Sequence, residues 1–172
     1  MKFNEHNEAV DLSKLKGFVK PSVHKKVKDT LNPVVWEDGK MNEDIRERLL
    51  IIAEDFFDGL ELGENVKYDD IILIGSMANY NWHRNSDFDI HLVIDYSQIN
   101  DDFELVEEYL TLQRKVWNNV HNIYIKGYPV EISIQNSVEE LASAGIYSVL
   151  NDKWISQPKH IEIPKGNEEK AN

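Results

Sequence analysis

The 172-residue sequence contains no cysteine, which excludes disulfide bonds and zinc sites built on thiolates. Basic residues are also scarce, since 19 lysines and arginines stand against 31 aspartates and glutamates and give a net charge of −12. This balance disfavours broad electrostatic binding of a nucleic-acid backbone. No apolar run approaches the ~20 residues that cross a bilayer. With no secretory pattern either, we expect a cytoplasmic protein without a membrane partner.

The few basic residues are unevenly distributed, because lysines gather near the N-terminus at Lys14, Lys16, Lys20, Lys25, Lys26 and Lys28. In the same segment Val23, Val27 and Leu31 recur every four residues, which predicts a short helix with a solvated lysine face. A docking arm for an acidic partner or RNA is the alternative.

The chain divides into three segments. Residues 1–38 form an N-terminal extension with the short helix, and the breakers Asn32-Pro33 and Asp38-Gly39 end it. Residues 39–163 form one domain, and residues 164–172 are polar enough to predict a disordered tail. Helical spacing of apolar residues predicts one helix across 45–57 and a longer one across 103–120, and residues 137–150 are expected to add a short third helix.

A strand with one polar face is predicted from Asp87 to Asp95. Its even positions are apolar and its odd positions mostly polar, so Asp87 and Asp89 share a face. They are roughly 6.7 Å apart at ~3.3 Å per residue. A divalent cation would turn the repulsion of this pair into ligation, and oxygen ligands suit magnesium. In so acidic a chain, an ordinary solvated strand face is the alternative.

Two further features precede and follow this strand. The apolar run Ile71–Ile74 ends in Gly75-Ser76, where glycine permits a turn and serine suits the N-cap of a short helix through about His83. Such a helix start is a ready anion site, or simply a common strand–helix turn.

Downstream, the alternating segment 130–135 carries Glu131 and forms a hairpin with 122–125. If its strand lies beside the aspartates, three carboxylates converge on a two-metal site; alone, Glu131 is a solvated strand residue.

These motifs resemble the nucleotidyltransferase superfamily typified by DNA polymerase β. The resemblance rests on Gly75-Ser76, ten intervening residues, Asp87-Phe88-Asp89-Ile90 and the later Val130-Glu131-Ile132, and it covers roughly residues 41 to 135. It implies an α+β fold, a small mixed β-sheet with flanking helices that forms a nucleotidyltransferase-like palm across residues 39–163.

The resemblance also implies roles for individual residues. Gly75 and Ser76 would hold the triphosphate, Asp87 and Asp89 would bind two Mg²⁺ ions, and Glu131 would complete one metal site and orient the nucleophile. Where many members carry an Arg and a Gly after Gly-Ser-x-Ala, this chain has Asn79-Tyr80. Arg84 and His83 are then the residues that would bring positive charge to a phosphate, or else they belong to a polar surface loop.

A narrower similarity is to uncharacterised nucleotidyltransferase-like proteins of tailed bacteriophages, carried by residues 75–82, 86–91 and 127–131. It implies a phage-encoded protein in the host cytoplasm or the virion. We therefore expect transfer of a nucleoside monophosphate from a nucleoside triphosphate to a hydroxyl acceptor, which would be a macromolecule, protein or RNA. The alternatives are a weakly active or inactive assembly protein that binds phage structural proteins, and an antitoxin-type enzyme that adds AMP to a partner protein.

Overall fold

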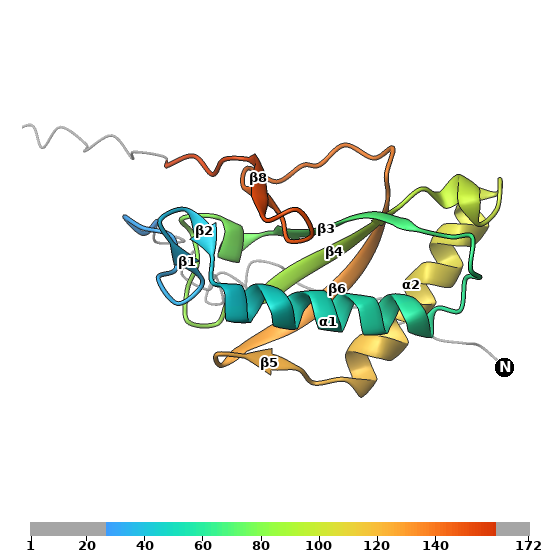
Figure 1. The fold of residues 1–172 in the computed structure, drawn as a ribbon, viewed down its shortest axis with the longest axis horizontal. Coiled ribbons are helices and arrows are strands. Elements are labelled where there is room, and N and C mark those ends of the chain that lie inside the picture. The colour runs from blue at the N-terminus through green and yellow to red at the C-terminus, as the bar shows by residue number, and fades with distance from the viewer. Residues whose placement is uncertain (1–26, 161–172) are drawn as a thin grey trace, which may run out of the picture.

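The computed structural model describes residues 27–160, drawn in colour in Figure 1. Most of the predicted N-terminal helix, the lysines before Lys28 and the predicted tail at 164–172 lie outside the described residues. Residues 27–31 contain no helix. The described chain begins with a small hairpin formed by β1 (Trp36–Glu37) and β2 (Lys40–Met41), which leads directly into the first helix.

A six-stranded mixed sheet forms the centre of the domain. In chain order its strands are β3 (Tyr68–Ile74), β4 (Phe88–Ile94), β5 (Tyr124–Ile125), β6 (Tyr128–Asn136), β7 (Ile146–Ser148) and β8 (Lys153–Ser156). Their order across the sheet is β5-β6-β4-β3-β7-β8. Only the β4–β6 pair among them is parallel, and the other neighbours are antiparallel. The expected α+β class with a small mixed sheet and flanking helices is confirmed.

The helix α1 (Glu43–Gly59) covers one face of this sheet, as Figure 1 shows. It begins at Asn42, whose side-chain oxygen accepts a hydrogen bond from the Asp44 amide at 3.0 Å, and so satisfies a free donor of the first turn. Its buried side chains are Ile45, Leu49, Ala53 and Phe56. The apolar spacing in the sequence predicted this helix correctly.

The helix α2 (Phe103–Val120) is the long helix that the sequence predicted, and it crosses from β4 to the parallel strand β6. Val106 and Leu110 are buried in the core. Near its end, Asn118 donates to the Ile132 carbonyl at 3.0 Å and accepts from the Ile132 amide at 3.2 Å. One carboxamide thus pairs with the β6 backbone as a neighbouring strand would, and it fixes α2 beside β6.

Two predicted helices are wrong. Between Ser76 and His83 there is a single 3-10 turn, η2 (Ser76–Ala78), because the Asn79 side chain donates to the Gly75 carbonyl at 2.6 Å and its own backbone is extended. Between 137 and 150 the chain instead contributes β7, whose Tyr147 lies opposite Leu73 of β3. Pairing with the free edge of β3 outweighs the local helical preference there.

Candidate functional site

Three carboxylates gather on the polar face where β4 begins. Asp89 of β4 lies opposite Glu131 of β6 in the parallel register, so their side chains share one face of the sheet. Asp87 immediately precedes β4 and lies close enough to Glu131 to raise the pKa of its carboxyl group. The strand with Glu131 therefore lies beside the strand with the aspartates, which is the arrangement that the convergence of the three carboxylates requires.

The electrostatics of Glu131 show that these groups interact. Partial burial raises the pKa of the Glu131 carboxyl, and the charge and hydrogen bond of Asp87 and the charge of Asp89 raise it further. The guanidinium of Arg114 opposes this shift and lowers the pKa. A carboxyl group with a raised pKa beside two others is a place where bound positive charge is favourable.

His91 continues the same face and holds Asp89 in position. Its Nε2 lies 3.1 Å from Asp89 Oδ1, and its Nδ1 lies 2.7 Å from Gln135 Oε1. Burial by itself lowers the pKa of His91, but the hydrogen bond to Asp89 and the charge of that carboxylate outweigh burial, and the pKa lies above its ordinary value. A partner of this kind fixes the orientation of a carboxylate that binds an ion.

The backbone of Gly75 lies close to the Asp89 side chain, with no side chain of its own between them. It has a φ of 78°, and a Cβ added there would lie 3.5 Å from Asp89 Cβ and 3.6 Å from Asp89 Oδ2. Beside it, Ser76 Oγ donates to Ser86 Oγ at 2.8 Å, and Ser86 Oγ accepts from the His83 amide at 2.9 Å. These bonds close the loop between β3 and β4 against the start of β4.

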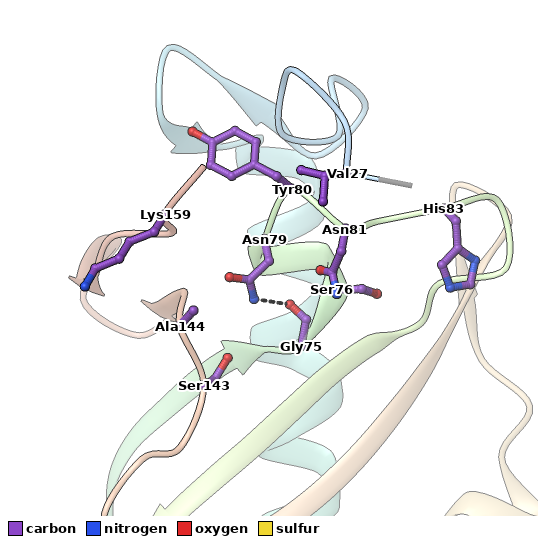
Figure 2. A pocket seen from close by; sticks show the side chains of 10 residues that line it. All are labelled: Val27, Gly75, Ser76, Asn79, Tyr80, Asn81, His83, Ser143, Ala144 and Lys159. Carbon is purple, nitrogen blue, oxygen red and sulfur yellow. Dashed lines mark hydrogen bonds between the residues drawn. The ribbon is translucent and has the colours of Figure 1, made fainter. Parts of the chain in front are cut away.

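A cavity of about 600 Å³ adjoins this loop, and Figure 2 shows the side chains that line it. Gly75 and Ser76 line it together with Asn81, His83 and Lys159. Within residues 27–160, the Asn81 Oδ1 atom is the buried side-chain oxygen or nitrogen that has no hydrogen-bond partner. None of the three carboxylates lines this cavity, so Gly75 and Ser76 form the boundary between the two features.

Arg84 is placed differently from the other expected phosphate contacts. It is exposed, does not line the cavity, and forms no ion pair with the residues of the described range. The cations that do lie near the site are Lys159 at the cavity and Arg114 near Glu131. Sequence reasoning missed both.

A signal for Arg114 was present in the sequence. It falls four residues after the buried Leu110 and three before the half-buried Trp117, so its charge interrupts the inward apolar stripe of α2. For Lys159 no such signal exists, because β7 and β8 carry the chain back toward Gly75 from far along the sequence.

The donor set suits magnesium in chemical type, since Asp87, Asp89 and Glu131 supply only carboxylate oxygens. Across residues 27–160, however, no three histidine, cysteine, aspartate or glutamate side chains are arranged closely enough to hold a metal ion. Ligation would therefore require these side chains to turn toward a shared ion.

Comparison with known proteins gives little. No protein-family model and no curated protein matches the chain. Among solved structures, it is similar to a STING-associated CdnE c-di-GMP synthase from Capnocytophaga granulosa, with 16% sequence identity and a TM-score of 0.31. The match covers 69% of this chain and 43% of that chain. A likeness this distant carries no argument about activity.

Within the described range, no helix has both the length and the apolar character of a membrane span.

Proposed function

We propose that this chain is a nucleotidyltransferase, which moves a nucleoside monophosphate from a nucleoside triphosphate to a hydroxyl acceptor. The observation that supports the proposal is the meeting of Asp87, Asp89 and Glu131 on one sheet face, directly beside the backbone of Gly75. Repulsion among three carboxylates does not stabilise a structural domain. In an ion-binding site the same three groups are needed, because a bound cation turns their repulsion into ligation.

In this proposal Asp87, Asp89 and Glu131 hold two Mg²⁺ ions, and His91 keeps Asp89 oriented. Bound magnesium supplies the positive charge that favours an attacking alkoxide and a leaving pyrophosphate. The acceptor oxygen forms a bond to the α-phosphorus as the bond to the pyrophosphate oxygen breaks. Glu131 would complete one metal site and orient the attacking hydroxyl group, whose proton passes to water as the new bond forms.

The nucleotide would lie along the loop after β3. Gly75 allows a phosphate to approach the backbone, Ser76 adds a hydroxyl, and Arg84 is the exposed cation of the same loop. The neighbouring cavity of about 600 Å³ falls within the ~300–1,000 Å³ range of small-molecule sites. The positive charge of Lys159 in its wall complements a negatively charged ligand.

The identity of the acceptor is a further part of the proposal. The described residues form a six-stranded sheet, the small β1–β2 hairpin and two α-helices. We propose a macromolecular acceptor, a protein or RNA, that brings its own surface. In a phage-encoded protein, transfer of AMP to a partner protein is the specialised form. A weakly active or inactive assembly protein is the alternative, and the observation behind it is that no three acidic or histidine side chains of residues 27–160 are arranged closely enough to hold a metal ion.

Thermal melting with and without ligand tests the proposal. Mg²⁺ together with a non-hydrolysable nucleoside triphosphate should raise the Tm, because a ligand that binds only the folded state stabilises it. The variant Asp87→Ala plus Asp89→Ala should lose this rise. Asp55→Ala plus Asp101→Ala removes the same charge from exposed positions and should keep it. An equal rise in the Asp87/Asp89 variant would contradict the proposal.

The acceptor can then be sought directly. Each radiolabelled triphosphate is incubated with the protein and a host lysate, and the macromolecule that acquires label is identified. For the assembly protein, the test is copurification with virions and assembly by the Asp87/Asp89 variant.

A further inference from the structure

Within residues 27–160, the outer side of α2 carries an exposed apolar stripe, in which Tyr109 is tied to the rest of the domain by its hydroxyl, a donor to the Leu60 carbonyl at 3.3 Å. Leu105, Tyr109, Leu112, Val116 and Val120 are 54%, 41%, 61%, 59% and 70% exposed. The core-facing side of the same helix is separate, because Val106 and Leu110 are buried. Single exposed apolar residues are ordinary, but five in line on one helix indicate a contact surface.

The spacing of the stripe identifies the kind of partner. From Leu105 to Val116 the steps are four, three and four residues, which is the alternating pattern of a two-helix seam. Leu105 and Leu112 alternate along the stripe with Tyr109 and Val116. A seam of this geometry packs against another helix and not against a flat or extended partner.

The charges beside the seam indicate which helix that is. Glu108 and Lys115 are seven residues apart, so they flank the stripe on the same side of α2. Around them, the first half of α2 contains Glu104 and Glu107, and Arg114 precedes Lys115 in the second half. A second copy of α2 in the opposite direction would place Glu108 near Lys115 of that copy, and the symmetry repeats the pair.

We infer that α2 is a dimerisation helix, which packs antiparallel against α2 of a second copy of this chain about a two-fold axis. The opposed helix dipoles and the repeated Glu108–Lys115 pair favour this direction over a parallel one. Arg114 faces Glu131 and His91, so the seam leaves the carboxylate site uncovered. The inference does not depend on the proposed activity.

Sedimentation equilibrium of the full chain over a concentration series tests the dimer. The wild type should approach twice the monomer mass, and Leu112→Glu should raise the dimer dissociation constant by at least about tenfold, because it places two charges in the seam. Ile51→Glu makes the same change at a 66% exposed position of α1 and should leave the dimer unchanged. A wild type that stays monomeric, or a dimer that Leu112→Glu does not weaken, would overturn the inference.

Charge reversal tests the antiparallel direction. Glu108→Lys alone and Lys115→Glu alone should each weaken the dimer, since each creates like-charge pairs across the seam. The double variant restores opposite charges and should recover the wild-type dissociation constant. A parallel pair predicts no such recovery, so a double variant as weak as the single ones would rule out the antiparallel arrangement. An unchanged far-ultraviolet circular dichroism spectrum of each variant shows that the fold is intact.

Discussion

Glu131 is the residue at which stability and ion binding are opposed. Partial burial and the charges of Asp87 and Asp89 raise the pKa of the Glu131 carboxyl, so its surroundings destabilise the ionised form. Glu131→Gln should therefore raise the free energy of unfolding of the metal-free protein by a few tenths to about 1 kcal/mol, the range of exposed charge interactions. The same variant should lose the Tm rise with Mg²⁺ and nucleotide.

The matched control is Glu64→Gln, which removes one carboxylate from an exposed loop. It should change neither quantity. Urea denaturation of the two variants in chelator, followed by melting with ligand, separates the two effects. If Glu131→Gln destabilises the metal-free protein, then the repulsion inferred among the three carboxylates is wrong.

Tyr147 gives the fold a dependence on alkaline pH. Burial, with its hydrogen bond to Asp152, raises the pKa of Tyr147 from 10.0 to about 12. The unfolded chain ionises first, so the contribution of this phenol to stability is complete below pH 10.0 and is lost as pH rises toward 12. Tyr147→Phe should thus show a shallower fall in unfolding free energy across this window, measured by urea titration at several pH values.

At neutral pH the same variant should lose about 1 kcal/mol, because the Asp152 carboxylate loses its donor. Tyr124→Phe at a 62% exposed position is the control and should follow the wild-type pH profile. A Tyr147→Phe profile identical to the wild type would show that Tyr147 does not cause the alkaline loss.

At the scale of the elements, the sequence predicted those parts whose periodicity is long. The apolar stripes of α1 and α2 and the alternation of β4 and β6 each extend over six or more residues, and all four elements were predicted correctly. The short segments 76–83 and 137–150 were not. Their conformation depends on Asn79 and on pairing with β3, which are tertiary contacts without a local signal.

In the candidate site too, the residues on long periodic segments were predicted and those placed by tertiary contacts were not. Asp87, Asp89 and Glu131 were found because two alternating strands carried them, and the parallel register of β4 and β6 brings the strands together. Their roles, with those of Gly75, Ser76 and Arg84, stay predictions. Asn81 and Lys159 were not found, since only the tertiary fold brings these positions to one cavity.

At the scale of the whole molecule, β3 links the two halves of the domain. On one side it pairs with β4 and ends at the Gly75 loop, and on the other it pairs with β7. Asn79 ties the loop to the start of β7, because its Nδ2 donates to the Gly75 carbonyl and its Oδ1 accepts from the Gly145 amide at 2.8 Å. The loop beside Asp89 is therefore positioned by residues late in the chain.

Gly145 allows this contact, and its replacement tests it. A Cβ at Gly145 would lie 2.0 Å from the Ala78 carbonyl oxygen and 2.9 Å from Asn79 Oδ1, so backbone would have to move. Gly145→Ala should lower the free energy of unfolding by about 1–3 kcal/mol or more, as overpacking does. In α1, a Cβ at Gly59 meets nothing within 4 Å, so Gly59→Ala should be neutral or stabilising by up to about 1 kcal/mol. Equal urea midpoints for the two variants would show that the loop does not depend on close packing against β7.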